Sequence, residues 1–426
     1  MKVLFRRGIP ARAGASLLAL AISLSVAQVA SAAPSAPANT ATPADAAAGR
    51  PARSPVAASP VRQASTLAIP SAPCNWPLWN VFANTHVQND GRVVDFSTPT
   101  QQSTSEGQAY ALFFALVNND RAAFDRVLGW TEANLAGGDL RARLPAWQWG
   151  RAKDGSYTAL DRNSASDADT WLAYTLFEAG RLWREPSFLM LARAVTAQIE
   201  DREVADLPGF GPMLLPGENG FQLADDVWRL NPSYLPLPVL RLLALQSPDG
   251  PWRRLAVNAE RFIVAVSPKG FAPDWAAYQT GKGFVVDPVK GDVGSYDAIR
   301  VYLWAGITSR GEPLLKPLLA ALGGMNVASL AAAPPEKVAT LAGGYTGAAP
   351  VGFSAALLPY YKTLGADRAL VAAQARVASA AAAPGNYYDN VLTLFGQGWL
   401  DGRYRLDGQG RLTPRWGNAC QSANAQ

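Results

Sequence analysis

Histidine and cysteine are almost missing from this chain, and their scarcity limits the chemistry it can perform. Its 426 residues include one histidine, His86, and two cysteines, Cys74 and Cys420. Zinc sites usually need three or four such ligands, and a Ser-His-Asp triad would have a single possible base. We therefore expect no metal and no cofactor, and we expect His86 to lie at the surface or at a helix cap. No phosphate-binding loop is apparent, because Gly281-Lys282-Gly283 has the pattern of a turn.

Long apolar runs are also scarce, and the clearest one lies near the start of the chain. Residues 17–29 are mostly apolar, follow four basic residues and precede Ala30-Ser31-Ala32, a small-residue cleavage site. This order is typical of a secretory signal peptide, which we assign to residues 1–32. The run is too short to span a bilayer. We therefore predict an exported protein, periplasmic or secreted, with no membrane span in the mature chain.

Large apolar side chains are rare in residues 33–71, which are mainly Ala, Pro, Ser and Thr with scattered Arg. Such a segment cannot bury enough surface to offset the entropy of ordering it. We predict a disordered, Ala/Pro-rich tether over residues 33–71. Residues 72–426 show no second change of composition, which indicates one large domain.

In an exported protein the two cysteines can form a structural disulfide. Cys74 and Cys420 lie near the two ends of the main domain, and in an oxidising compartment they can pair and tie these ends together. We predict a disulfide between them, and two unpaired thiols are the alternative.

The excess of basic residues is confined to the first 71 positions. The formal charge is +5, but residues 1–32 carry four cations and residues 33–71 a net +2, which leaves −1 for the domain. A near-neutral domain without a basic stripe argues against nucleic acid as a partner. The domain has many short helical patterns between Gly- and Pro-containing loops and few alternating patterns, which predicts a mainly helical fold.

Three acidic residues each stand close after a serine and just before an apolar helical run. They are Glu106, Asp167 and Asp297. If three helices begin at these points, their N-termini can direct the carboxylates into one cavity. Acid pairs around a cleft are what glycoside hydrolysis requires.

The flanking residues indicate where two of these helices begin. Ser105 with Gln108, and Ser166 with Asp169, fit the capping box. This register places Glu106 and Asp167 at the first helical position. Two alternatives remain: Ser103 can be the cap, and the acids can simply complement the helix macrodipole.

Several aromatic residues stand beside Pro, Gly or polar residues rather than within apolar runs. They are Trp147 and Trp149, Tyr234 close after Asn231, and Trp275. Exposed rings offer flat apolar faces on which sugar rings can stack. Each ring is also compatible with packing in the core.

Taken in order, these motifs resemble glycoside hydrolase family 8, and most closely its periplasmic cellulases that accompany bacterial cellulose synthase. The similar stretches lie between Cys74 and Cys420 and are Thr104-Ser105-Glu106-Gly107-Gln108, Leu144-Pro145-Ala146-Trp147, Asn163-Ser164-Ala165-Ser166-Asp167-Ala168-Asp169, Phe271-Ala272-Pro273-Asp274-Trp275, residues 295–300 and Leu394-Phe395-Gly396-Gln397-Gly398-Trp399.

The resemblance implies an all-α fold, the (α/α)6 barrel of six inner and six outer helices, and hydrolysis with inversion. Glu106 matches the family's proton donor and Asp297 its base. Asp167 matches a carboxylate whose role is either chemical or limited to holding the substrate ring. Arg300, one turn after Asp297, favours the ionised form of that base or is only a structural partner.

The implied function is an endo-β-1,4-glucanase that acts in bacterial cellulose biosynthesis. Its expected partners are a β-1,4-glucan and the cellulose synthase complex, and no nucleic acid. The expected substrate-binding residues are Trp147, Trp149, Asn231, Tyr234, Trp275 and Arg300. Two alternatives stay open: a relative that acts on xylan, mixed-linkage glucan or chitosan, and a noncatalytic glucan-binding protein.

Overall fold

The computed structural model describes residues 75–224, 226–330, 333–380 and 386–416. The predicted signal peptide (1–32), the predicted tether (33–71) and both cysteines of the predicted Cys74–Cys420 disulfide lie outside the described residues. These three assignments therefore stay predictions.

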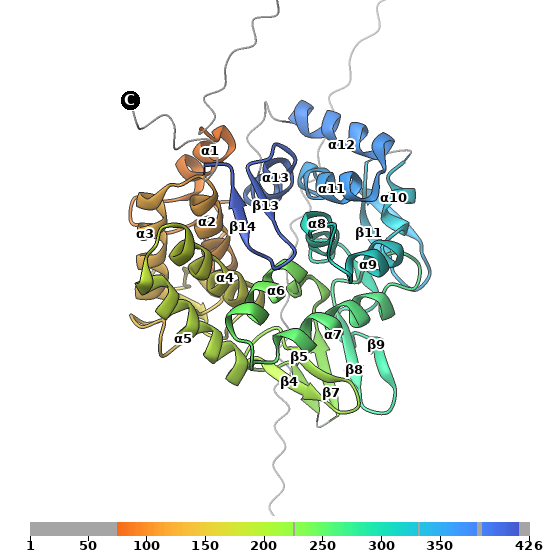
Figure 1. Ribbon diagram of the computed structural model, residues 1–426, viewed down its shortest axis with the longest axis horizontal. Coiled ribbons are helices and arrows are strands. Elements are labelled where there is room, and N and C mark those ends of the chain that lie inside the picture. Colours follow the sequence, from red (N-terminus) through yellow and green to blue (C-terminus); the bar gives the residue numbers. More distant parts are fainter. Residues whose placement is uncertain (1–74, 225, 331–332, 381–385, 417–426) are drawn as a thin grey trace, which may run out of the picture. The chain divides into compact units, whose positions relative to one another are not determined.

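Within the described residues, six helices form an inner ring (Figure 1). They are α2 (Ser105–Val117), α4 (Ser166–Leu182), α6 (Leu237–Gln246), α8 (Ile299–Ile307), α11 (Val351–Leu364) and α13 (Tyr387–Leu400). Each packs against the next, and Phe395 of α13 stacks on Phe113 of α2 with ring centroids 5.5 Å apart, which closes the ring. All nine residues of α8 are buried, as expected for a core helix whose residues are apolar except for Arg300 and Tyr302.

Six further helices cover the inner ones on the outside. They are α1 (Pro77–His86), α3 (Arg121–Trp130), α5 (Pro186–Arg202), α7 (Trp252–Ala265), α9 (Leu315–Ala321) and α12 (Asp367–Ala380). Each outer helix packs on one inner helix: α3 on α2, α5 on α4, α7 on α6, α9 on α8, α12 on α11, and α1 on α13. Three short helical pieces, η1 (Thr131–Leu135), η2 (Pro232–Tyr234) and α10 (Gly324–Ala328), complete the described set. The predicted (α/α)6 barrel is confirmed.

Strands are more numerous than the sequence patterns indicated: the described residues contain fourteen, in five antiparallel sheets. The sheets are β1 (Ser103–Thr104), β2 (Gln148–Arg151) and β3 (Tyr157–Asp161); β4 (Val204–Leu207) and β5 (Gly211–Leu214); β6 (Gln222–Ala224), β7 (Val227–Leu230), β8 (Ala276–Gln279) and β9 (Gly283–Val286); β10 (Val293–Gly294), β11 (Pro335–Ala339) and β12 (Tyr345–Ala348); and β13 (Tyr404–Leu406) and β14 (Leu412–Pro414). Strands of two to five residues are too short to show a clear alternation.

Most of the strands lie at one end of the barrel, and a site can form there. Strands β1 to β12 all lie in segments that lead from an outer helix to the next inner helix. Because inner and outer helices alternate in direction, these segments gather at the N-terminal ends of the inner helices. The predicted turn at Gly281 is the hairpin turn between β8 and β9, where Lys282 N donates to Gln279 O.

His86 lies in the last turn of α1 and is buried, with 5% of its surface exposed. Its Nδ1 is 3.1 Å from Val94 O and its Nε2 is 3.0 Å from Asn390 Nδ2. The expectation of a surface residue is therefore wrong, and burial lowers the pKa of this imidazole.

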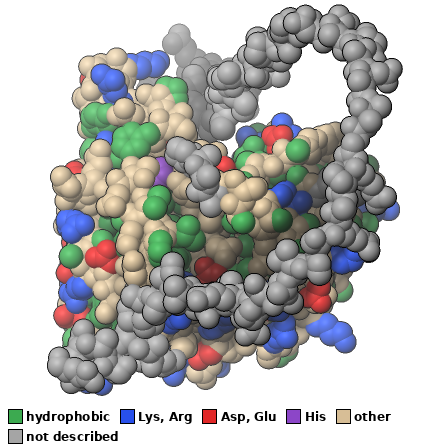
Figure 2. All heavy atoms as spheres, turned by 90° about the horizontal axis from the view of Figure 1, so that it is seen from above, with side chains coloured by type: hydrophobic (Ala, Val, Ile, Leu, Met, Phe, Trp, Pro, Cys, Tyr) green, Lys and Arg blue, Asp and Glu red, His purple; other side chains and the backbone are tan. Residues whose placement is uncertain are grey.

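The face of the molecule in Figure 2 shows basic and acidic side chains interspersed rather than gathered by sign. In the part of the chain that the structure describes, no helix is both long enough and apolar enough to cross a membrane.

Candidate active site

Glu106 and Asp167 lie at the open N-terminal ends of two neighbouring inner helices, at the second helical position of α2 and α4. Thr104 caps α2, since its hydroxyl accepts a hydrogen bond from Gly107 N at 3.0 Å. Helix α4 follows Ala165 and has no side-chain cap. Both predicted capping boxes and the alternative cap at Ser103 are therefore wrong, each by one position.

Gln108 explains why the first capping box does not form. Its Oε1 accepts from Val93 N at 2.6 Å, and its Nε2 donates to Thr131 Oγ1 at 2.9 Å. A buried backbone N–H needs an acceptor, and Gln108 supplies it to Val93 instead of turning back to its own helix.

Asp297 is not part of a helix but lies in a turn, two residues before the first residue of α8. Asp274 holds this turn, since its Oδ1 accepts from the backbone N–H of Ser295 (2.7 Å), Asp297 (3.1 Å) and Ala298 (2.8 Å). Sequence reasoning included Asp274 in a family-like stretch but missed this role, because the amides it binds are more than twenty positions away.

Arg300 joins the three acids. Its Nη1 donates to Asp167 Oδ2 at 3.0 Å and to Glu106 Oε2, and its Nη2 donates to Asp297 Oδ1 at 2.9 Å. The side chain of Arg300 is buried, with 4% exposed. The structure therefore brings Glu106, Asp167, Asp297 and Arg300 together, from α2, α4 and the start of α8.

The surroundings of Asp167 favour its protonated form. Arg300 Nη1 binds both Glu106 and Asp167, which brings these two carboxyl groups close together. Burial raises the pKa of Asp167 well above its usual value, the charge of Glu106 raises it further, and Arg300 opposes both. The single guanidinium of Arg300 is shared among three carboxyl groups, so it does not offset the effect of burial on Asp167.

Asp297 is favoured in its ionised form at neutral pH. Burial raises its pKa to about 6, while Arg300 and a hydrogen bond from Trp275 favour the ionised form. Trp275 Nε1 donates to Asp297 Oδ2 at 3.0 Å. Both carboxylate oxygens therefore have a donor.

Three of the other predicted residues surround this cluster. The ring of Trp275 stacks on Phe221 with centroids 5.9 Å apart, and the ring of Tyr234 lies 5.7 Å from the guanidinium carbon of Arg300. Asn231 is buried, and its Oδ1 accepts from Ser233 Oγ at 2.7 Å. Asn231 therefore reaches the cluster through Ser233.

Trp147 and Trp149 lie farther from the acids. Trp147 contacts the start of α2 through its backbone, whose oxygen accepts from Ser105 N at 3.0 Å. The ring of Trp149 packs edge-on against Trp130, with centroids 5.8 Å apart. Both side chains are partly exposed, and no described contact joins either ring to the carboxylates.

Sequence reasoning missed two residues that bind Arg300. Ser233 Oγ accepts from Nη2 at 3.1 Å, and Tyr110 OH accepts from Nη1 at 3.3 Å. Tyr110 was open to prediction, because it follows Glu106 by four positions and therefore lies on the same face of α2. Within the described ranges, no three His, Cys, Asp or Glu side chains are placed to hold a metal ion.

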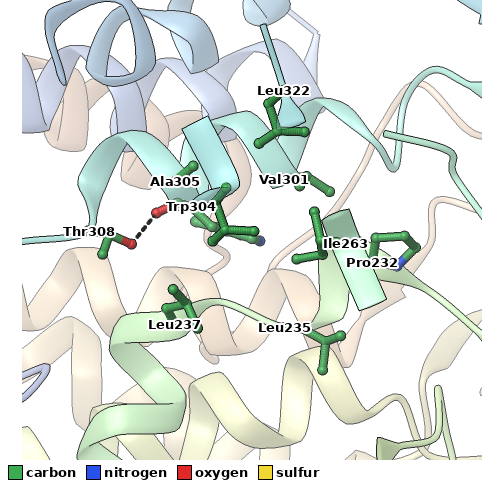
Figure 3. A pocket seen from close by; sticks show the side chains of 10 residues that line it. Pro232, Leu235, Leu237, Ile263, Val301, Trp304, Ala305, Thr308 and Leu322 are labelled. Carbon is green, nitrogen blue, oxygen red and sulfur yellow. Dashed lines mark hydrogen bonds between the residues drawn. The ribbon is translucent and has the colours of Figure 1, made fainter. Parts of the chain in front are cut away.

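A small cavity beside the site belongs to the core (Figure 3). Its lining is apolar except for Thr308, whose Oγ1 already donates to Trp304 O at 2.7 Å. Trp304, which precedes Thr308 by one turn, donates from its indole nitrogen to Ser233 O at 2.8 Å. The cavity is therefore lined in part by α8, the helix that carries Arg300, and no carboxylate lines it.

Comparison with known proteins identifies the family of this chain. The model of glycosyl hydrolases family 8 matches residues 57–402. An endoglucanase of Xanthomonas axonopodis pv. citri (strain 306) is 54% identical over 359 residues, which are 83% of this chain and 92% of that protein. An endoglucanase of Escherichia coli (strain K12) is 43% identical over 354 residues, or 83% and 95% of the two chains.

A solved structure shows the same fold. The crystal structure of an endo-1,4-D-glucanase from Vibrio fischeri ES114 superposes with a TM-score of 0.78 at 40% identity, and the match covers 81% of this chain and all of that one. Since the family model spans most of the chain and relatives this similar match nearly their whole length, the chain belongs to glycosyl hydrolases family 8.

Proposed function

We propose that this glycoside hydrolase is an endo-β-1,4-glucanase that cleaves cellulose chains internally, with inversion of the anomeric centre. The observation that carries the proposal is the contact of Glu106 and Asp297 with different terminal nitrogens of one buried guanidinium. An inverting enzyme needs an acid and a base separated by room for a water molecule, about 6.5–9.5 Å. The shared guanidinium places the two carboxyls in one site, and the stereochemistry of the product tests whether a water molecule fits between them.

Glu106 is proposed as the general acid. A general acid must bring a proton to the leaving oxygen, and Glu106 stands where the similar family motif has its proton donor. The Glu106 side chain is 23% exposed and that of Asp167 is 3% exposed. Glu106 is therefore the member of the pair that a substrate can reach.

Asp297 is proposed as the base that activates water. Its pKa of about 6 leaves it mostly ionised at neutral pH, which the role requires. Its side chain is 35% exposed, so water has access to it. The donors Arg300 and Trp275 fix the direction of its two oxygens.

Asp167 is proposed to hold the sugar ring at the point of cleavage, with Arg300 keeping its carboxyl in place. A direct chemical role remains the alternative. Trp147, Trp149, Tyr234 and Trp275 are proposed to offer ring faces to the glucan, and Asn231 is proposed to bind it indirectly, by orienting Ser233.

One assay with three polymers tests the function. Release of reducing ends is measured on carboxymethylcellulose, xylan and chitosan under the same conditions. We expect carboxymethylcellulose to be cleaved fastest, with a rapid fall in viscosity that marks internal cleavage. Faster release from xylan or chitosan would assign another substrate, and binding without release from any polymer would indicate a noncatalytic glucan-binding protein.

We also propose that the protein is exported, acts in the periplasm or outside the cell, and serves cellulose synthesis beside the synthase complex. The support is the N-terminal pattern of residues 1–32 and the resemblance of the motifs. N-terminal sequencing of the mature protein should begin at Ala33. Co-purification with a tagged synthase subunit should recover the protein, and its absence from that complex would limit the proposal to polymer degradation.

A further inference from the structure

A second cavity lies at the end of the barrel opposite the acids. It has a volume of about 370 Å³ and is formed by the ends of α8, α11 and α13 together with β13 (Figure 1). Glu106 and Asp167 lie instead at the N-terminal ends of inner helices. Helix α8 has nine residues and spans about 13 Å, with Arg300 near its start and the cavity at its end. The cavity is therefore separate from the proposed active site.

Three basic side chains line this cavity, and no acidic side chain lines it. They are Arg310, shortly after the end of α8, Lys362 in the last turn of α11, and Arg405 in β13. Among the described residues, no carboxylate forms an ion pair with any of the three. Partial burial lowers the pKa of the Arg405 guanidinium, and the group that opposes this is a tyrosine, Tyr404, rather than an acid. The cavity therefore gathers positive charge that the fold does not neutralise.

Backbone carbonyl groups around the cavity hold the two arginines in place. Arg310 Nη2 donates to Lys362 O at 3.1 Å. Arg405 Nη1 donates to Trp399 O and to Tyr404 O, the latter at 2.8 Å. Such carbonyls at helix ends have no partner within the helix and need a donor. These bonds use one terminal nitrogen of each guanidinium, so the arginines are positioned and the carbonyls are satisfied.

The other donors of these three side chains remain available to a ligand. In the part of the chain that the structure describes, no acceptor lies within hydrogen-bond distance of Lys362 Nζ, or of Nε and the second terminal nitrogen of either arginine. The guanidinium of Arg405 also lies over the ring of Trp399, with 4.5 Å between its carbon and the ring centroid, which fixes its plane. A ligand in this cavity therefore meets charged donors, which favour an anion rich in acceptor oxygens.

We propose that this cavity binds a phosphate monoester on a molecule of sugar size, held by Arg310, Lys362 and Arg405. A phosphate monoester carries about −1.5 to −2 charge at neutral pH and has three strong acceptor oxygens, which suits three cations around one space. The volume of about 370 Å³ lies within the range of small-molecule sites, about 300–1,000 Å³. Because the cavity and the acids lie at opposite ends of the barrel, the ligand does not compete with the glucan.

Two binding measurements on the full chain test the site and distinguish the sources of such a group. Calorimetric titration with glucose 6-phosphate tests a free ligand, and glucose is the control without the phosphate. Co-sedimentation with vesicles of phosphatidic acid tests a lipid headgroup, and phosphatidylglycerol vesicles are the control, because they are anionic but lack the monoester. We expect glucose 6-phosphate to bind, glucose not to bind, and the affinity to fall as salt rises, since exposed charges are screened.

Variants of the lining residues show whether the binding occurs in this cavity. Lys362→Gln removes a charge whose nitrogen has no described acceptor, so the fold should be unaffected while the Kd for glucose 6-phosphate rises by about three- to tenfold. Arg310→Gln should act in the same direction. The matched control is Arg193→Gln, which removes an exposed cation on α5 that does not line the cavity, and it should leave the Kd unchanged.

The outcomes of these tests do not depend on which polymer the protein cleaves. Binding to phosphatidic acid vesicles alone, in preference to phosphatidylglycerol, would support the site and assign its ligand to a lipid headgroup. A Kd above about 10 mM for glucose 6-phosphate, with no preference among vesicles, would overturn the proposal. Equal binding of glucose, an unchanged Kd in both Lys362→Gln and Arg310→Gln, or displacement of glucose 6-phosphate by a cello-oligosaccharide would overturn it as well.

Discussion

The indole nitrogen of Trp275 donates a hydrogen bond to Asp297 Oδ2 at 3.0 Å, while Arg300 donates to the other oxygen of the same carboxylate at 2.9 Å. A carboxylate with a donor on each oxygen is fixed in direction and is favoured in its ionised form. The pKa of Asp297 is nevertheless raised to about 6, because burial outweighs both donors.

Activity should therefore fall on the acid side as Asp297 gains a proton near pH 6. Trp275→Phe keeps the ring but removes the donor, which raises the pKa of Asp297 further and moves the acid limb of kcat/KM to higher pH. The matched control is Trp183→Phe, which removes an indole bond to Asn119 Oδ1 far from the acids and should leave the limb in place. An unmoved limb in Trp275→Phe would contradict the assignment of Asp297 as the base.

Replacing Glu106 tests the general acid. Glu106→Gln keeps the shape of the side chain but removes the transferable proton, so we expect kcat to fall by about 10²–10⁴-fold while binding of cello-oligosaccharides is retained. The control Glu260→Gln, on outer helix α7, should keep full activity. Near-normal turnover by Glu106→Gln, measured on carboxymethylcellulose, would exclude Glu106 as the acid.

The stereochemistry of the product tests the mechanism. Proton NMR of fresh cello-oligosaccharide hydrolysis should show the α anomer first, because water attacks the β-linked carbon from the opposite side. Asp297→Asn should lose most of the rate. Initial β product would mean a covalent intermediate and would require the carboxyl groups to be closer, about 5–5.5 Å apart.

The barrel itself depends on a close contact between two inner helices. A Cβ on Gly396 of α13 would lie 1.8 Å from Ala355 O of α11. We expect Gly396→Ala to reduce the free energy of unfolding by about 1–3 kcal/mol or more through overpacking. Gly129→Ala in α3, where nothing lies within 4 Å, should be neutral or stabilising by up to about 1 kcal/mol. Urea unfolding of both variants makes the comparison, and equal effects would refute the packing argument.

The two cysteines give a prediction for the ends of the domain. Nonreducing peptide mapping of the exported protein should recover a linked peptide that contains Cys74 and Cys420. By the loop-entropy model a bond that closes so long a loop stabilises the fold by about 6 kcal/mol. Recovery of both residues as free thiols would reject the disulfide.

The sequence by itself determined the helical class and the approximate helix starts near Glu106 and Asp167. Apolar side chains at helical spacing predict a buried helix wherever it ends up in the fold, and polar residues before them mark its beginning. The family-like order of motifs supplied the barrel and the candidate acids. These features are local, so neighbouring residues along the chain are enough to reveal them.

Only the tertiary structure decided which partner each polar group takes. Gln108 had a partner within its own helix turn available, but it binds Val93, because the packing of α2 buries a backbone N–H that must find an acceptor. Asp274 holds the turn of Asp297, and Ser164 binds Glu203 across 39 positions. Arg300 could have paired with Asp297 alone, and the closure of the inner ring gives it Glu106 and Asp167 as well. Burial then raises the pKa of Asp167 and of Asp297, and burial depends on the whole fold rather than on any stretch of sequence.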